Sequence, residues 1–259
     1  MEPQKNTSLL PLNTPIDHLG RPLTLKSKLA EGYTGEVYDG ELIVDEQAVR
    51  VAVKARKELD YAGARENFRQ EAITLASLME YEKNSNKRTG TPGLKIAPVY
   101  YGLNTYKTSE RETDYIVMEF IEGVEIPKLL KKQQFMSEKD ALVAGWHFYR
   151  TLHILHTDLK KVFIDLKLEN LWWVEGTETA PAQLKVTDLG TLADIKKPSQ
   201  VEHDLLLGGI ILCTLLTGYT PRYNVYGLKE RIDPILRSHP MTWGTRQVMR
   251  RLLHHSPEQ

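Results

Sequence analysis

The chain has 259 residues, of which 41% are hydrophobic, and its 34 lysines and arginines balance its 34 aspartates and glutamates. This length and this hydrophobic content predict one large domain or two small lobes with a real core. A formal net charge of zero does not favour non-specific binding to nucleic acid, so no nucleic-acid partner is expected.

Three features bear on the compartment. Met1–Leu10 has one lysine and no sustained apolar stretch, so no Sec-type signal is expected. The single cysteine, Cys213, lies in an apolar run and is predicted to be a small buried hydrophobe. That run, Leu205–Leu216, is too short to cross a bilayer and fits a buried helix, so no membrane span is expected. These features predict a cytoplasmic protein, or an effector delivered without a Sec-type signal.

The first part of the chain is predicted to be rich in strands. Residues 1–22 contain several prolines, asparagines and threonines, and we expect an extension that wraps or frays. Apolar patterning then predicts strands over Leu23–Leu29, Glu36–Val44 and Ala48–Ala55, followed by an amphipathic helix over Ala64–Glu82. The polar and basic stretch Lys83–Lys95 is predicted to be a solvated loop, with contact to an acidic partner as the alternative.

The second part of the chain is predicted to be mostly helical. Short strands near Val99–Leu103 and Tyr115–Phe120 complete the first sheet, and Gly123 marks a boundary. The remaining predictions are a helix from a capping box at Ser137 to about His156, strands at Leu171–Val174 and Gln183–Thr187, and helices at Val201–Thr217 and Thr245–His254. This order predicts an α+β fold with lobes over 23–121 and 122–259, joined by a hinge near Glu119–Gly123.

Two segments of the first lobe suit phosphate binding. Gly32 and Gly35 lie in the connection between two predicted strands, where glycines let backbone amides approach phosphate oxygens. Lys54 ends the run Val51-Ala52-Val53-Lys54, and a strand-borne lysine can reach a phosphate. A half-buried lysine needs a carboxylate partner, for which we prefer Glu71 on the following helix over its rival Glu66.

The run Phe163–Trp172 has the spacing that phosphoryl transfer requires. Asp165 lies two residues before Lys167 and five before Asn170, and a second acid follows in Asp188-Leu189-Gly190. Asp158, in the similar run His156–Lys160, is the alternative candidate for the acid at this site. Five residues after it comes Phe163, which cannot bind a metal, so we prefer Asp165.

Together these motifs resemble the eukaryotic-like Ser/Thr protein kinase superfamily. The two glycines, the lysine strand, Glu71, the hinge-like Tyr115–Phe120, the D-x-K-x-x-N run, D-L-G and the D-x-x-x-x-G element from Asp204 to Gly209 occur in protein-kinase order. The resemblance implies a bilobal fold, with a small antiparallel sheet and one main helix in the first lobe and a mostly helical second lobe.

The resemblance also implies roles for individual residues and two cofactors, ATP and Mg²⁺ or Mn²⁺. Lys54 would bind the α- and β-phosphates and pair with Glu71, Asp165 would be the catalytic base, and Lys167 would neutralise the γ-phosphoryl group. Asn170 and Asp188 would hold the metal. The remaining nucleotide contacts would be Ala30, Gly32, Gly35, Val37, Ala52, Met118, Glu119, Ile121, Glu125 and Trp172.

Departures from the usual kinase pattern indicate a minimal member. Ile164 replaces the arginine that commonly pairs with a phosphorylated loop, so control by loop phosphorylation is not expected. Only thirteen residues, Thr191 to His203, separate Gly190 from Asp204, and no A-P-E motif follows. Lys167 favours a kinase acting on Ser/Thr of a protein substrate of unknown identity. The alternatives are a small-molecule phosphotransferase, which the short segment favours, and a nucleotide-binding pseudokinase or interaction module.

Overall fold

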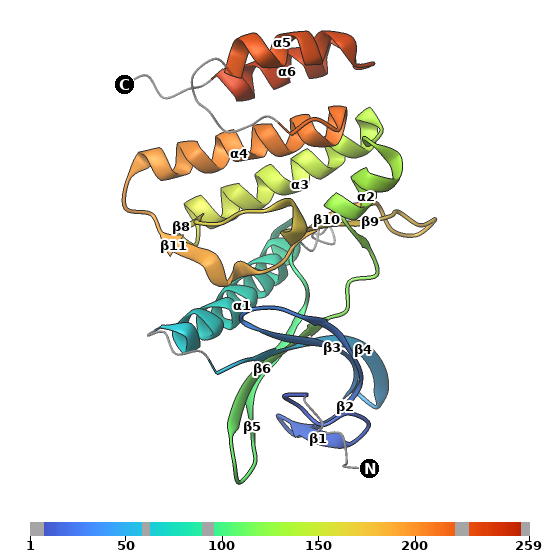
Figure 1. Cartoon of the computed structure of the whole chain (residues 1–259), viewed down its shortest axis with the longest axis vertical. Coiled ribbons are helices and arrows are strands. Elements are labelled where there is room, and N and C mark those ends of the chain that lie inside the picture. Colours follow the sequence, from blue (N-terminus) through green and yellow to red (C-terminus); the bar gives the residue numbers. More distant parts are fainter. Residues whose placement is uncertain (1–7, 59–62, 90–95, 221–227, 255–259) are drawn as a thin grey trace, which may run out of the picture. The chain divides into compact units, whose positions relative to one another are not determined.

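The computed structural model describes residues 8–58, 63–89, 96–220 and 228–254 (Figure 1). The chain forms two compact units. The first contains residues up to Gly93 together with Ala97–Ile121, and the second contains Leu94–Ile96 together with Glu122–Gln259. The first unit is a sheet with one helix and the second is mostly helical, as the α+β prediction required.

The first unit is built on a six-stranded antiparallel sheet in the order β1-β2-β3-β4-β6-β5. Its strands are β1 (Pro15–His18), β2 (Arg21–Glu31), β3 (Gly35–Val44), β4 (Gln47–Arg56), β5 (Tyr100–Lys107) and β6 (Glu112–Glu119). The helix α1 (Ala64–Thr89) lies against β5. One sheet face forms the core, which contains Leu10, Leu23, Leu25, Tyr38, Leu42, Val51, Val53, Ala55, Tyr115 and Val117.

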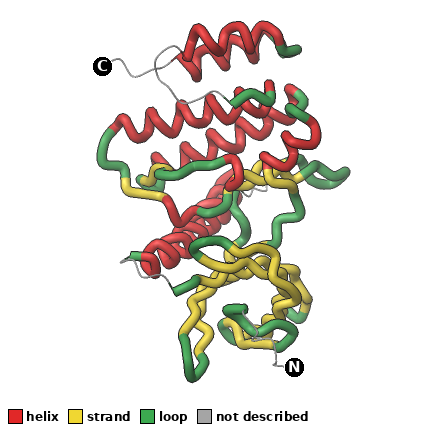
Figure 2. The backbone as a smooth tube through the Cα atoms, viewed as in Figure 1, coloured by secondary structure: helices red, strands yellow, loops and turns green. Residues whose placement is uncertain are grey.

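The sheet curls so that its first hairpin meets its last strand (Figure 2). His18 and Arg21 flank the β1–β2 turn, and both side chains bond the carbonyl oxygen of Tyr101 on β5, at 3.3 and 2.6 Å. Gly102 has φ +143°, and a Cβ there would lie 2.5 Å from Leu19 Cδ1. Only glycine lets the two ends of the sheet approach this closely.

Over the described residues, the N-terminal segment that was expected to wrap or fray packs against the sheet, and its later part forms strands of the sheet, which was not predicted. Leu10 is buried in the core, and β1 and the start of β2 lie inside the range assigned to the extension. The hairpin turn is formed by Leu19 and Gly20, both with positive φ. Asparagine is the common first residue of such a turn, and because this chain has Leu19 there, the sequence did not indicate a hairpin.

The predicted loop at Lys83–Lys95 is also wrong over its first half. Helix α1 continues to Thr89, seven residues past the expected end at Glu82, while residues 90–95 lie outside the described ranges. No glycine or proline occurs between Glu82 and Gly90, so nothing in the chain ends the helix earlier.

Over the described residues, the second unit combines five α-helices and two short 3₁₀ turns with two small sheets. The α-helices are α2 (Ile126–Gln133), α3 (Glu138–Thr157), α4 (Pro198–Thr217), α5 (Leu228–Ser238) and α6 (Trp243–His254). The sheets are ordered β10-β9-β7 and β11-β8, with β7 (Val124–Glu125), β8 (Lys161–Phe163), β9 (Leu171–Val174), β10 (Gln183–Val186) and β11 (Leu192–Asp194). Of the two 3₁₀ turns, η1 (Leu168–Asn170) contains Asn170, and η2 (Leu189–Thr191) directly follows Asp188.

Helix α4 is the apolar centre of the second unit. Glycines allow α3 and α4 to lie close together: a Cβ on Gly145 would lie 3.1 Å from Leu212, and one on Gly208 would lie 2.9 Å from the Tyr149 ring. The helix has 20 residues, so by length and composition it could span a membrane. However, 67% of its apolar window is buried inside the structure, which is also typical of a core helix.

Asp204 on α4 fixes the beginning of the loop that follows β8. Its side chain is fully buried, and Oδ2 accepts hydrogen bonds from the Phe163 backbone N–H at 3.1 Å and from His156 Nε2 at 2.8 Å. The end of α3, the start of α4 and strand β8 are therefore joined through one carboxylate.

Because Leu10 is buried in the sheet core, Leu10→Ala should lower the free energy of unfolding by about 2–5 kcal/mol. The matched control is Leu29→Ala on β2, where the side chain is exposed, and the expected change is within about 0.5 kcal/mol. Urea unfolding measures both. Equal and small effects would contradict the placement of the N-terminal segment.

His147 on α3 should make stability depend on pH. Its buried ring accepts a hydrogen bond at Nδ1 from the Leu184 N–H (2.8 Å), and burial, with a smaller contribution from Arg150, lowers its pKa to about 4. The folded pKa lies below the unfolded one, so this stabilisation is present above about pH 6.5 and is lost as the pH falls towards 4.

The control variant His147→Asn keeps an acceptor near the Leu184 N–H but does not titrate. The difference in unfolding free energy between wild type and variant should shrink by about 1.4 kcal/mol per pH unit across that window. A difference that stays constant between pH 7 and pH 4 would refute the assignment.

Candidate functional site

Lys54 and Glu71 form the ion pair that was expected between the sheet and the helix of the first unit. Lys54 Nζ on β4 lies 3.0 and 2.7 Å from the two carboxylate oxygens of Glu71 on α1. The lysine side chain is 16% exposed and the glutamate 5%. The rival, Glu66, is exposed in the first turn of α1. The ammonium group is therefore held in place at the surface of the sheet.

The strand register gathers the predicted nucleotide contacts of the first unit on one sheet face. Val37 pairs with both Ala30 and Lys54, and Ala52 pairs with Met118. Paired residues point to the same side of a sheet, as do residues two apart on a strand. These five side chains thus share the face opposite the core that Val51 and Val53 fill.

The turn between β2 and β3 is closed by two backbone hydrogen bonds, one within the turn and one from Lys57, which follows β4. The Gly32 N–H donates to the Gly35 carbonyl at 2.8 Å, and the Lys57 N–H donates to the Thr34 carbonyl at 3.0 Å. A Cβ on Gly35 would lie 2.3 Å from the Ala55 carbonyl oxygen, whereas Gly32 has free space around it. Only the second glycine is therefore required by packing.

The end of β6 is already partly engaged by a neighbouring segment. The Glu119 N–H donates to the Val99 carbonyl at 2.8 Å, and the Val99 N–H donates to the Glu119 carboxylate at 3.0 Å. Any contact of the Glu119 backbone with a base would therefore fall to its carbonyl group. Ile121 is the last residue of the first unit.

In the second unit, Trp172 and Glu125 are neighbours across the small sheet. Trp172 on β9 pairs with Glu125 on β7, and the next residue, Trp173, points to the opposite face and is buried. Strand alternation thus assigns the core role to Trp173 and leaves Trp172 partly exposed. The Glu125 carboxylate accepts from Lys128 Nζ at 2.9 Å.

The loop after β8 brings the expected charged groups together. Lys167 Nζ forms an ion pair with the Asp165 carboxylate, and both side chains are about half exposed. The hydrogen bond from Lys167 to Asp165 is the main cause that raises the pKa of Lys167, with smaller contributions from Asp188 and Glu169. Lys167 is therefore a cation that is paired with Asp165 and more weakly attracted by Asp188 and Glu169.

Thr187 holds Asn170 next to Asp188. Its backbone N–H and its hydroxyl both donate to the Asn170 carbonyl, at 2.8 and 3.1 Å, and Asp188 follows directly in the chain. Asp188 has φ +57° and ψ +52°, a left-handed conformation that costs energy for a residue other than glycine. Sequence reasoning missed Thr187, because a threonine before an acid has no distinctive signal.

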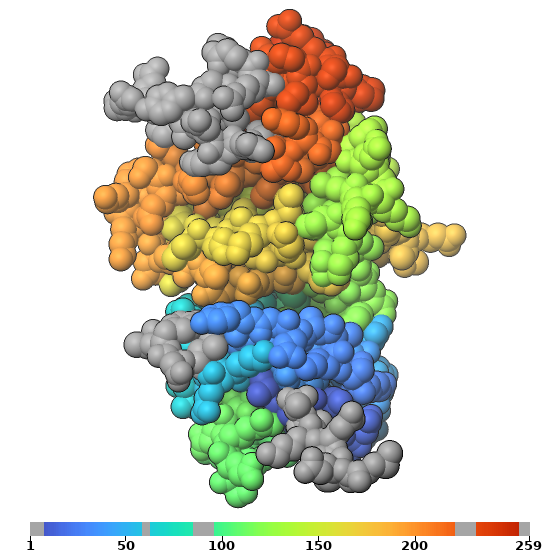
Figure 3. Space-filling model, viewed as in Figure 1, coloured from blue at the N-terminus to red at the C-terminus, as the bar shows by residue number. Residues whose placement is uncertain are grey.

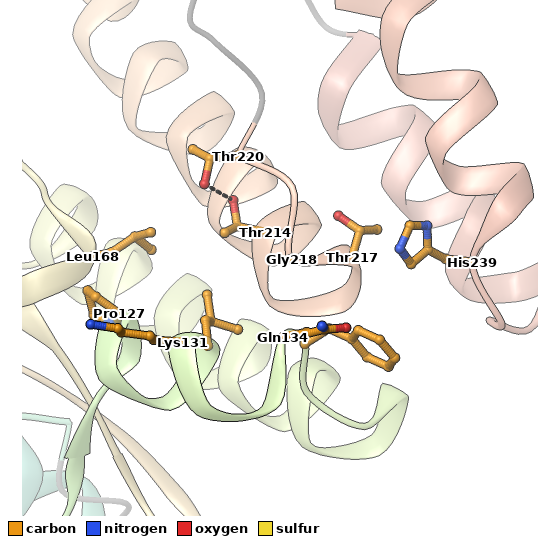
Figure 4. Close-up of a pocket in the computed structure, with 11 residues that line it drawn as sticks. Pro127, Lys131, Gln134, Leu168, Thr214, Thr217, Gly218, Thr220 and His239 are labelled. Carbon is orange, nitrogen blue, oxygen red and sulfur yellow. Dashed lines mark hydrogen bonds between the residues drawn. The ribbon is translucent and has the colours of Figure 1, made fainter.

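A hollow of about 610 Å³ opens beside this loop in the second unit (Figure 4). Pro127, Leu130 and Lys131 of α2, Leu168 of η1, and Thr214 and Thr217 near the end of α4 contribute to its lining. Leu168 lies between Lys167 and Asn170 in the sequence, so the hollow adjoins the loop with the candidate catalytic residues.

Comparisons with known proteins identify the family. Ribosomal protein S6 kinase alpha-3 from Mus musculus and the protein of the same name from Homo sapiens are each 26% identical to this chain over 137 residues. The match covers 42% of this chain and 18% of each relative, so the chain spans less than a fifth of their length. A family model described as the protein kinase domain matches residues 23–206, which is well over half of the 259 residues. The chain belongs to the protein kinase domain family.

Proposed function

We propose that the chain is an ATP- and Mg²⁺-dependent kinase that phosphorylates Ser or Thr of a protein substrate. The observation that carries this proposal is the loop after β8, where Asp165 and Lys167 form an ion pair and Thr187 holds Asn170 next to Asp188. Phosphoryl transfer depends mostly on positioning and electrostatics, and this loop supplies the charged groups that it needs.

Each charged residue then has one task. Asp165 orients the acceptor hydroxyl and accepts its proton, while the cationic Lys167 offsets negative charge on the transferred γ-phosphoryl group. Lys54, held by Glu71, binds the α- and β-phosphates. In the first unit, the sheet face with Ala30, Val37, Ala52 and Met118 is the proposed contact surface for the adenine. In the second unit, Trp172 is a proposed contact for the base and Glu125 for the ribose hydroxyls.

Asn170 and Asp188 would hold the metal. An amide oxygen and a carboxylate are hard oxygen donors that suit Mg²⁺ or Mn²⁺. The described part of the chain has no cluster of three or more His, Cys, Asp or Glu side chains, so phosphate oxygens and water would complete the coordination, as is usual for Mg²⁺. When bound, the metal supplies charge neutralisation at the phosphates.

The acceptor class has two candidates. A polypeptide is supported by Lys167, because a lysine at this position is typical of Ser/Thr protein kinases, and by the hollow of about 610 Å³ beside Leu168. A small molecule is supported by the short segment after Gly190. There β11 pairs with β8 and α4 begins at Pro198, so few residues remain to form a platform for a peptide.

Asp165→Asn should reduce phosphoryl transfer by about 10²–10⁴-fold, since it removes the acid–base group. The matched control is Asp158→Asn at the exposed end of α3, which should stay within about twofold of wild type. Incubation with γ-labelled ATP, Mg²⁺ and a cell lysate measures both. Label on a protein that Asp165→Asn abolishes supports the proposal, and label only on a soluble metabolite would replace it by the small-molecule function. Nucleotide binding without any transfer would indicate a pseudokinase.

Asp188→Asn should raise the Mg²⁺ concentration for half-maximal activity by about tenfold or more, because a neutral amide replaces a carboxylate ligand. Asparagine tolerates the left-handed conformation of this residue, so the fold should persist. The control is Asp194→Asn on β11, whose carboxylate pairs with Lys161 at 2.8 Å. An equal shift in both variants, or none in Asp188→Asn, would rule out the metal assignment.

A further inference from the structure

A buried carboxylate on β3 binds the N-terminal segment. The Glu36 side chain is almost fully buried, and its Oε2 accepts hydrogen bonds from the Tyr38 hydroxyl and from the Leu9 backbone N–H (2.9 Å). The Tyr38 oxygen in turn accepts from the N–H groups of Leu9 and Leu10, at 2.8 and 3.3 Å. Two side chains on one strand thus fasten a segment that lies about 28 residues earlier in the chain.

The same carboxylate is connected to the β2–β3 turn through alternating charges. Lys28 Nζ lies 3.2 Å from Glu36 Oε1 and 2.6 Å from Glu31 Oε2. Lys57 Nζ lies 2.6 Å from Glu31 Oε1 and 3.1 Å from the Gly32 carbonyl oxygen. Hydrogen bonds from the two lysines lower the pKa of Glu31 to about 2, which agrees with a carboxylate held between two ammonium groups.

Gly32, Tyr33 and Thr34 of the turn are exposed on the first unit, whose strands β2 and β3 are drawn in blue in Figure 3, so burial does not fix their conformation. Within the turn, one backbone bond joins its two glycines. A turn that presents amides to an anion binds more tightly when its conformation is fixed beforehand, since less conformational entropy is lost on binding.

We propose that the network from Leu9 through Tyr38, Glu36, Lys28, Glu31 and Lys57 positions the Gly32–Gly35 turn for the phosphates of a nucleotide. The N-terminal segment thereby contributes to nucleotide affinity without touching the ligand. This inference rests on the proposed nucleotide-binding function. Lys28, Glu36 and Tyr38 are positioning residues in this scheme.

Two variants interrupt the network at different points. Tyr38→Phe removes the hydroxyl while keeping the ring in the core, and Lys28→Met removes the ammonium group between Glu36 and Glu31. Lys28→Met changes a partly exposed residue, so it keeps the test interpretable if Tyr38→Phe fails to fold. The matched control is Lys26→Met on the same strand, whose ammonium group pairs with Glu41 at 2.7 Å, outside the network.

The first measurement is amide hydrogen exchange without nucleotide. Exchange of the Gly32 and Lys57 amides, which close the turn, should be about threefold to tenfold faster in Lys28→Met and Tyr38→Phe, and unchanged in Lys26→Met. Unchanged exchange in Lys28→Met would overturn the proposal. An equal rise across β2, β3 and β4 would also overturn it, because the network would then stabilise only the fold.

The second measurement is the affinity for Mg-ATP, together with KM and kcat. The Kd and the KM for ATP should rise about threefold to tenfold in the two network variants, with kcat at saturating ATP within about twofold. A loss confined to kcat would overturn the inference. If the wild-type chain bound no ATP, the proposed function would fall, and the exchange measurement would still decide whether the network orders the turn.

Discussion

The buried carboxylate of Asp204 is the constraint on which the geometry of the second unit depends. A carboxylate without contact to water is unfavourable unless donors compensate it, and here His156 and the Phe163 backbone N–H both donate to Oδ2, while Oδ1 is buried without a hydrogen bond in the described part of the chain. Because Asp165 follows Phe163 by only two residues, this compensation also fixes where the loop after β8 begins. The core of α4 and the candidate catalytic loop are thus ordered by the same interaction.

The first unit solves a similar problem with a different group. The ammonium group of Lys54 is mostly buried, and the Glu71 carboxylate offsets the cost of removing it from water. The strand register determines what surrounds the ammonium group. Because Val37 pairs with Lys54 and Ala52 pairs with Met118, small and apolar side chains lie on the same sheet face as the charge. In both units, charged groups are positioned by partners on a different element, so a local change in either partner reaches the site.

The sequence predicted those parts of the molecule that depend on local pattern or fixed spacing. The α+β order, the kinase family, the partner of Lys54 and the burial of the α4 run followed from periodicity and from motifs. Features that depend on distant partners were not predictable. Leu10 is held in the core by Tyr38, which lies 28 residues later in the chain. Strands β8 and β11 have only three residues each, which is too short for a sequence pattern, and the hydrogen bond from Thr187 to Asn170 joins two separate turns. Lys57 was missed for the same reason, because its contact with Gly32 crosses 25 residues.

The left-handed backbone of Asp188 lowers the stability of the fold at a residue that is also the proposed metal ligand. Most L-residues in this conformation are disfavoured by about 1–2 kcal/mol, and aspartate, which tolerates it better than most, still costs more than glycine would. Glycine at this position would relieve the strain and remove the proposed metal ligand at the same time. Selection of this chain for thermal resistance alone would therefore tend to replace the proposed metal ligand, and an engineering programme would have to hold Asp188 fixed while it searched elsewhere for stability.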